Sequence, residues 1–208
     1  MARAGLTPER LAHAGAALAD EIGFDRVTVA ELARRFDVKP ASLYSHVQGS
    51  EDLKVRIALV ALDELADRAA DAIAGRSRRD AIAALGNAYR TYATEHPGRF
   101  DAAHHRLDAE TAARSAGSRH SQMTRAILRG YELGERDETH AVRLIGSTFQ
   151  GFVTLESSGG FDHSDPPADE SWERIIDALH QLLQNWPHSA VGGTPSNHAP
   201  TNDATSTN

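Results

Sequence analysis

Residues 28 to 47 constrain this chain most, because their pattern fits two short helices joined by a tight turn. Thr28 stands three residues before Glu31, a spacing that predicts a helix start in which hydroxyl and carboxylate satisfy each other's free amides. Apolar residues then recur with a helical period, at Val29, Leu32, Ala33 and Phe36. The pattern therefore predicts a helix from Thr28 to Phe36 that packs one face against its neighbours.

A second short helix is expected directly after the turn, from about Pro40 to Val47. Asp37 tolerates a left-handed backbone, and Pro40 suits a first helical turn because its missing amide would have had no partner there. Leu43 and Val47 are spaced to face inward together. The outward side chains are then Lys39, Ala41, Ser42, Tyr44, Ser45 and His46. A short helix with this face is suited to enter the major groove of DNA.

These residues resemble the TetR-like family of bacterial transcription regulators, over roughly residues 7 to 56. The resemblance extends through the Leu43-Tyr44 and His46-Val47 pairs and the run from Gly49 to Leu53. It implies that double-stranded operator DNA is contacted by Thr28, Lys39, Pro40, Ala41, Ser42, Tyr44, His46 and Lys54. Lys39 and His46 are expected to hold phosphates, Tyr44 a phosphate or a base methyl, and the two small residues to approach base edges.

The chain departs from the family pattern at two positions. Asp37 replaces the usual turn glycine, and Ser50 replaces a lysine near the start of the next helix. Ser50 is expected to cap that helix, with Glu51 and Asp52 favourable beside its N-terminus. Lys54 lies one turn further on, where it either supplies the missing phosphate contact or is a solvated surface residue.

The net charge of −7 is divided unevenly along the chain. Residues 1 to 56 hold eight basic and eight acidic side chains, so the remaining 14 basic and 21 acidic side chains carry the whole net charge. A neutral reading head attracts phosphates weakly, and affinity must come from placed contacts and from two heads binding together. A homodimer is therefore expected.

The composition fits a single helical chain that acts in the cytoplasm without a membrane partner. Its 208 residues suffice for a sizeable core and a small appended domain. The sequence has no cysteine, no leader segment and no run of about 18 apolar residues. These features exclude disulfide, secretory and transmembrane interpretations.

The fold is predicted to be all-α, with about nine helices in two domains. Residues 1–49 form a three-helix DNA-binding domain, residues 50–187 an antiparallel helical bundle, and residues 188–208 a disordered tail. Further helices are expected over residues 8–23, 50–74, 79–95, 108–131, 137–158 and 171–186, with a short piece at 97–104. The loop from Phe161 to Asp169 is expected to be mobile.

Residues 89–100 and 150–161 resemble paired signatures of one subgroup of TetR C-terminal domains. That resemblance implies a cavity for a small-molecule inducer and a four-helix dimer interface. Aromatic and flexible apolar groups suit such a cavity, and the candidates are Tyr92, His96, Phe100, Met123, Ile127, Phe149 and Phe152. The dimer candidates are Phe149, Trp172, Ile176, Leu179 and Leu183. Packing inside the core of one chain is the alternative for both sets.

Two other functional classes compete with this interpretation. His104 and Asp108 have the i, i+4 spacing of a metal-ligand pair, and His105 and Asp101 lie nearby, but the sequence offers no further ligand. A helical enzyme using His96, His104 or Glu156 is the second alternative, although no catalytic motif is present. No cofactor is expected. The favoured interpretation is a repressor released from its operator by an inducer.

Overall fold

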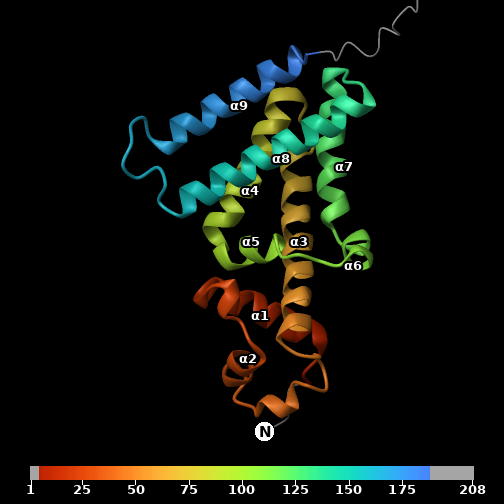
Figure 1. The fold of residues 1–208 in the computed structure, drawn as a ribbon, viewed down its shortest axis with the longest axis vertical. Coiled ribbons are helices and arrows are strands. Elements are labelled where there is room, and N and C mark those ends of the chain that lie inside the picture. The colour runs from red at the N-terminus through yellow and green to blue at the C-terminus, as the bar shows by residue number, and fades with distance from the viewer. Residues whose placement is uncertain (1–4, 188–208) are drawn as a thin grey trace, which may run out of the picture.

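Helices are the regular elements of residues 5–187, the part of the chain that the computed structural model describes (Figure 1). The α-helices are α1 (Pro8–Ile22), α2 (Val29–Arg35), α3 (Ser50–Ile73), α4 (Arg78–Glu95), α5 (Pro97–Ala103), α6 (Ala109–Arg114), α7 (Gly117–Leu128), α8 (Glu135–Ser157) and α9 (Ala168–Gln184). Three short 3₁₀ helices, η1 (Phe24–Arg26), η2 (Pro40–Ser42) and η3 (Arg129–Tyr131), connect them. The all-α prediction is confirmed, and the predicted tail at 188–208 lies outside the described residues.

The helix predicted over residues 108–131 is wrong in its continuity. The structure divides that stretch into α6, α7 and η3. Ser115 lies at the first break in extended backbone, where its hydroxyl donates to the carbonyl of Ala112 and accepts from the amide of Gly117. This local bonding by a serine side chain competes with a continuing helix.

The head of the molecule comprises α1, α2, the segment after α2 and the first half of α3. Its core includes Leu11, Leu32, Leu43 and Leu53, each with no exposed surface, and Ile57 from the next turn of α3. In Figure 1 the head forms one end of an elongated molecule, and the segment between α2 and α3 lies at its tip. α3 runs from the head into the body.

The body consists of the second half of α3 with α4 to α9. Its largest core cluster joins α4, α7, α8 and α9 around three aromatic rings that are tilted against one another. The Trp172 ring centroid lies 5.3 Å from that of Phe149 and 4.9 Å from that of Phe152. Trp172 Nε1 also donates to Asn87 Oδ1 at 2.6 Å, so α9 is fixed on α4 by both apolar and polar contacts.

α5 makes a second connection between head and body, because it packs against α1. A Cβ atom added to Gly98 of α5 would lie only 2.0 Å from the carbonyl oxygen of Ala19 in α1. Only a residue without a side chain allows two backbones to approach so closely. Gly98 therefore fixes the distance between α1 and α5.

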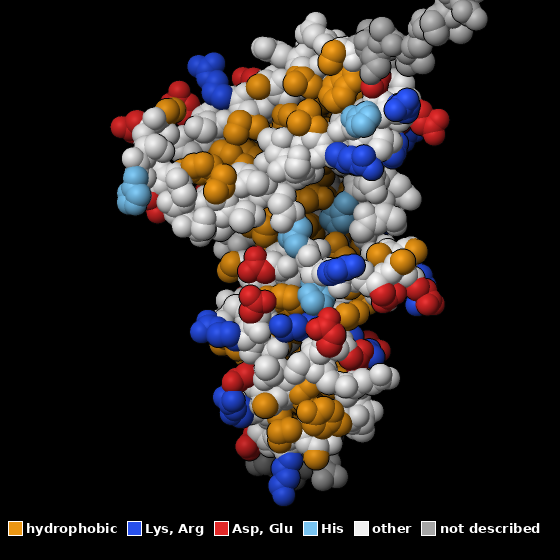
Figure 2. Space-filling model, in the orientation of Figure 1, with side chains coloured by type: hydrophobic (Ala, Val, Ile, Leu, Met, Phe, Trp, Pro, Cys, Tyr) orange, Lys and Arg blue, Asp and Glu red, His pale blue; other side chains and the backbone are white. Residues whose placement is uncertain are grey.

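Figure 2 shows acidic and basic side chains interspersed over one face of the molecule, with basic atoms at the tip of the head. Within residues 5–187, no helix is both long and apolar enough to span a bilayer.

Candidate nucleic-acid interface

The start of α2 is capped by two hydroxyl groups. The amide of Glu31 donates to Thr28 Oγ1 at 3.2 Å, as the sequence predicts. The reciprocal half of the predicted capping box does not form within residues 5–187, because the Glu31 carboxylate pairs with Arg34 at 2.6 Å. Ser50 supplies the second cap, since its Oγ accepts from the amide of Val29 at 3.3 Å.

Ser50 was therefore predicted in the wrong role. It is the first residue of α3, whose N-cap is Gly49, and no side chain caps that helix. The hydroxyl of Ser50 reaches back across 21 residues to α2 instead. It ties together the two helices that flank the segment at the tip.

The turn after α2 has the geometry that the sequence predicts. Asp37 has a left-handed backbone with φ of 51°. The amide of Val38 donates to the carbonyl of Ala33 at 3.0 Å, and the amide of Asp37 to that of Arg34 at 3.1 Å. This pair of bonds is the Schellman arrangement of a helix end, here with aspartate in place of glycine.

We call residues Lys39 to Gln48 the reading segment. The α-helix predicted here from Pro40 to Val47 is wrong, because the structure has the 3₁₀ helix η2 followed by turns. The amide of Leu43 bonds to Pro40 at 2.9 Å, and that of Val47 bonds to Leu43 at 3.0 Å. So short a helix has little stability of its own. Burial of Leu43 and Val47, with 0% and 1% exposed, holds the segment in place.

Most of the predicted DNA contacts lie on the outer side of the reading segment. Tyr44 is 59% exposed. Lys39, Pro40, Ala41 and Ser42 are also exposed, whereas His46 and Thr28 are partly buried. Within residues 5–187, Lys39 has no carboxylate at ion-pair distance, in contrast to Arg34 and to Arg35, which pairs with Glu21. The segment thus presents a cation, an aromatic ring and small groups to solvent.

Lys54, unlike the exposed residues of the reading segment, contacts other residues of the head. Its Nζ donates to the backbone carbonyl of Asp25 at 3.2 Å and lies 5.3 Å from the centre of the Phe24 ring. These contacts tie η1 to α3. The sequence left two roles open for Lys54, a phosphate contact or a solvated surface position. The structure instead gives it contacts within the head.

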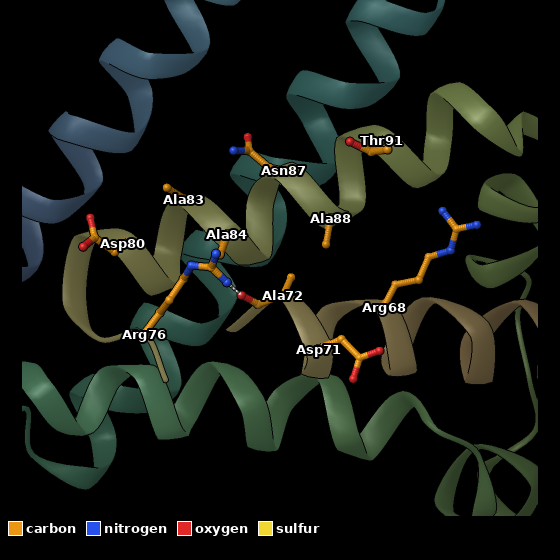
Figure 3. A pocket seen from close by; sticks show the side chains of 10 residues that line it. All are labelled: Arg68, Asp71, Ala72, Arg76, Asp80, Ala83, Ala84, Asn87, Ala88 and Thr91. Atoms are coloured by element: carbon orange, nitrogen blue, oxygen red, sulfur yellow. Dashed lines mark hydrogen bonds between the residues drawn. The ribbon is translucent and has the colours of Figure 1, made fainter. Parts of the chain in front are cut away.

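A cleft of about 700 Å³ lies between α3 and α4 (Figure 3). None of the seven predicted ligand residues lines it. Tyr92 and Phe100 pack with Leu65 in a small cluster at the corner of α3, α4 and α5. The body core contains Met123, Ile127, Phe149 and Phe152. His96 lies where α4 meets α5.

The five predicted dimer residues are buried inside one chain. Phe149, Trp172, Ile176, Leu179 and Leu183 have at most 6% of their surface exposed and belong to the body core. The wide apolar stripe of α9 is therefore used on α4 and α8. Leu155 of α8 and Leu182 of α9 remain outside, with 52% and 43% exposed.

The histidines near residue 104 contact two different parts of the chain. His104 Nδ1 lies 2.8 Å from the carbonyl oxygen of Phe100, and His105 Nε2 lies 3.0 Å from Glu51. In the described part of the chain, no three His, Asp or Glu side chains are grouped to hold a metal ion.

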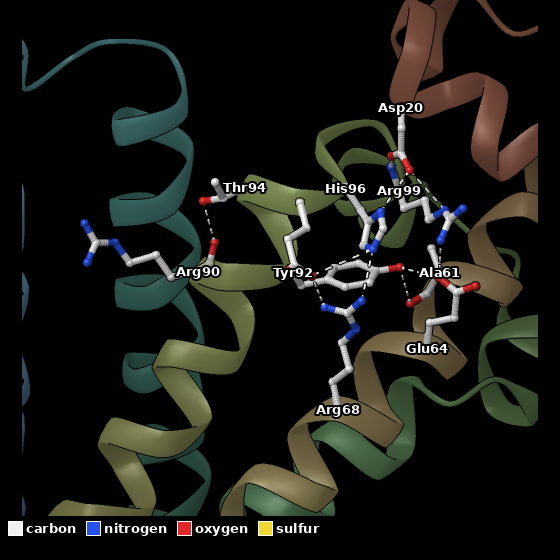
Figure 4. A network of polar contacts seen from close by, with 10 residues as sticks. Asp20, Ala61, Glu64, Arg68, Arg90, Tyr92, Thr94, His96 and Arg99 are labelled. Atoms are coloured by element: carbon white, nitrogen blue, oxygen red, sulfur yellow. Dashed lines mark hydrogen bonds and ion pairs between the residues drawn. The ribbon is translucent and has the colours of Figure 1, made fainter.

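A polar cluster between α1, α3, α4 and α5 was not predicted from the sequence. We call it the junction (Figure 4), and it consists of Asp20, Glu64, Arg68, Tyr92, His96 and Arg99. Asp20 accepts from the amide of Arg99 at 2.9 Å and lies 3.2 Å from His96 Nδ1. Because 76 or more residues separate these partners, no local pattern in the sequence indicates them.

A helical head with an exposed reading segment, carried by a helical body, defines a helix-turn-helix DNA-binding transcriptional regulator. Residues 11–53 match bacterial regulatory proteins of the tetR family, and residues 82–179 match the tetracyclin repressor-like C-terminal domain. The chain belongs to the TetR family, and the resemblance seen in the sequence is confirmed.

Similar proteins extend over most of the chain. The helix-turn-helix transcriptional regulator Rv0681 of Mycobacterium tuberculosis is 32% identical over 169 residues, which cover 79% of this chain and 77% of that protein. The regulator YobS of Bacillus subtilis is 28% identical over 183 residues, which cover 88% of this chain and 96% of that protein.

Solved structures share the fold. A TetR variant from Acinetobacter baumannii in complex with minocycline has a TM-score of 0.66 at 18% identity, covering 87% of this chain and 98% of that one. Apo ActR from Streptomyces coelicolor has a TM-score of 0.69 at 18% identity, covering 88% and 97%. These likenesses concern the fold alone.

Proposed function

We propose that this regulator is a homodimeric, cytoplasmic repressor that leaves its operator when a small molecule binds the body. It acts by binding and not by turnover. The observation that carries the proposal is the reading segment, which combines two buried anchors with an outer face that has few contacts inside the chain. A segment that is fixed from within and free outside is suited to present side chains to DNA.

The chemistry of the side chains on the outer face of the reading segment assigns their contacts. Lys39 and His46 hold phosphates, which fix the position of the head on the duplex. Tyr44 contacts a phosphate or a thymine methyl group, and Ala41 with Ser42 approach base edges. Thr28 adds a contact from the start of α2, while Lys54 supports the head from within.

Dimerisation is proposed through the outer faces of α8 and α9. Leu155 and Leu182 are the large apolar side chains exposed there. They replace the five core residues as candidates, because a side chain buried in one chain has no surface left for a second. Two heads joined in this way bind successive major grooves, about 34 Å apart.

The first test is fluorescence anisotropy of the purified protein with the DNA upstream of its own coding region. A salt series and scrambled DNA of equal length serve as references. We expect salt-sensitive binding that prefers the native DNA.

Tyr44→Ala tests DNA contact independently of folding, because the side chain is exposed. We expect it to lower affinity for the native DNA about tenfold or more, equivalent to about 1.4 kcal/mol, with unfolding unchanged. His163→Ala, which truncates an exposed ring of the body between α8 and α9, is the control. If Tyr44→Ala bound the native DNA with unchanged affinity, the proposal that the reading segment contacts DNA would be wrong.

A further inference from the structure

The cleft between α3 and α4 has two walls of different chemistry (Figure 3). Arg68 and Ala72 lie one helical turn apart on the same face of α3, and Arg76 follows in the turn after that helix ends at Ile73. The α4 wall is lined by Asp80, Ala83, Ala84, Asn87, Ala88 and Thr91. Small apolar surfaces therefore lie between two guanidinium groups. A volume of about 700 Å³ falls within the range of small-molecule sites, roughly 300–1,000 Å³.

The charge of Arg76 is not balanced within the cleft. Its guanidinium donates back to the carbonyl of Ala72 in the last turn of α3, and no carboxylate of residues 5–187 lies at ion-pair distance from it. Asp71 and Asp80 also line the cleft, but neither pairs with it. In Figure 3 the Asp71 carboxylate and the Arg76 guanidinium lie on opposite sides of Ala72. An anion above the alanines would supply the missing partner.

Arg68 belongs to both the cleft and the junction. It pairs with Glu95 at 2.5 Å, its Nη2 lies 3.0 Å from His96 Nε2, and it stacks 5.1 Å above the Tyr92 ring centre. A guanidinium only donates hydrogen bonds, so Nε2 of His96 accepts. The proton of the neutral ring is then on Nδ1, which donates to Asp20 Oδ2 at 3.2 Å (Figure 4).

Asp20 carries this contact into the head. It lies near the end of α1, and its side chain is only 16% exposed. Besides His96 it binds the amide of Arg99 and lies 3.1 Å from Arg99 Nε. Ala19, the preceding residue, is in backbone contact with Gly98. A change in the position of His96 therefore acts on α1 beside the close contact between Ala19 and Gly98.

We propose that the α3–α4 cleft binds a small organic anion with an apolar part, and that Arg68 couples its binding to the head. Arg76 is the primary anchor. Arg68 turns from Glu95 and His96 towards the bound anion, and the loosened His96 releases Asp20. This inference rests on the proposed function, because operator affinity is the quantity that the anion changes.

The site itself is tested without DNA. Octanoate, octanol and octylammonium share one apolar chain and differ in charge, and their binding to the full chain is measured by calorimetry. We expect saturable octanoate binding at least tenfold stronger than that of the other two, weakened at least tenfold by Arg76→Gln. Equal binding of all three, preference for octylammonium, or no octanoate binding would overturn the site.

The coupling is tested by operator affinity with and without saturating octanoate. We expect about a tenfold change, within the usual range of allosteric coupling. His96→Leu removes both ring contacts and is expected to abolish the change while octanoate and DNA still bind separately. His96→Gln retains a donor and an acceptor and is expected to restore part of it.

The outcomes separate this inference from the proposed function. If the protein fails to bind operator DNA even without octanoate, the proposed function fails while calorimetry still decides the site. If DNA and octanoate both bind but do not affect each other, the coupling through Arg68 is wrong. Chemical unfolding of both His96 variants shows that any loss of coupling occurs in folded protein.

Discussion

The reading segment and the junction use polar side chains in opposite ways. In the reading segment, Lys39 and Tyr44 point to solvent, and two buried aliphatic residues provide the anchorage. At the junction, Asp20 and Arg99 are largely buried and each has partners on other helices. The polar groups of the reading segment are free to bind DNA, whereas those of the junction bind one another and hold α1, α3 and α5 together. Burial and bonding therefore distinguish residues that contact DNA from residues that position the head.

The largest effect is expected from Gly98→Ala at the contact between α5 and α1. The added Cβ would lie 2.0 Å from the Ala19 carbonyl oxygen, so α5 must move away from α1. We expect a loss of roughly 4 kcal/mol in the free energy of unfolding, or failure to fold. Urea unfolding followed by circular dichroism measures it.

Gly134→Ala is the matched control for that substitution. Gly134 has φ of −67°, which alanine adopts, and no atom lies within 4 Å of its added Cβ. Because Gly134 is the N-cap of α8, where alanine is less favourable than glycine, we expect a loss of no more than about 1 kcal/mol. Equal stability of the two variants would contradict the close contact between α5 and α1.

Leu43→Ala is expected to have the next largest effect, about 3 kcal/mol, because it empties a fully buried site in the head core. The adjacent residue, Tyr44, is exposed. Tyr44→Ala is therefore expected to change the free energy of unfolding by less than about 0.5 kcal/mol. Thermal unfolding of both variants tests whether anchorage and contact are divided between adjacent residues. Similar losses would show that Tyr44 also supports the fold.

Ser50→Ala removes the hydroxyl that accepts from the amide of Val29. We expect a loss of about 1 kcal/mol, the usual cost of removing a helix cap. Ser45→Ala, at an exposed residue of the reading segment, is the control and is expected to be nearly neutral. An unaffected Ser50→Ala would show that Thr28 alone is sufficient to cap α2.

The smallest effect is a pH dependence that arises in the body, outside both regions. Burial lowers the pKa of His120, whose Nδ1 lies 2.5 Å from the Tyr89 hydroxyl and whose Nε2 lies 3.2 Å from the Leu62 carbonyl oxygen. The unfolded chain, with a histidine pKa near 6.5, therefore binds more protons. We expect stability to fall as the pH drops below about 6.5.

His120→Gln should flatten that dependence between about pH 7.5 and 5.5. The pKa of His104 is lowered by burial as well, so part of the slope is expected to remain. Denaturant midpoints at each pH measure the difference between the two proteins. An unchanged slope would assign the pH dependence to other groups.

The sequence predicted those features that depend on neighbouring residues. Thr28 caps α2, Asp37 adopts the left-handed turn, and Leu43 and Val47 face the core. Each of these follows from bonds or spacings within about five residues. The short reading segment is 3₁₀ and not α-helical, because its shape is set by tertiary packing more than by helix propensity.

Features that depend on distant partners were missed or misassigned. The hydroxyl of Ser50 serves α2 across 21 residues, and Asp20 meets Arg99 across 79. An apolar stripe such as that of α9 shows only that a face is buried, and not whether it packs against the same chain or a copy. Trp172 illustrates this, since its ring is covered by α4 and α8.

The uneven charge of this elongated molecule also affects how it meets DNA. The head is neutral, and the excess of acidic residues follows residue 56, in the part of the chain that continues from the head into the body. At low ionic strength the phosphates repel the body from a distance and exert a torque that turns the head towards the duplex. Added salt weakens this alignment together with the phosphate contacts, but it also relaxes the repulsion. The measured salt slope of operator binding is therefore expected to understate the number of phosphates that the two heads contact.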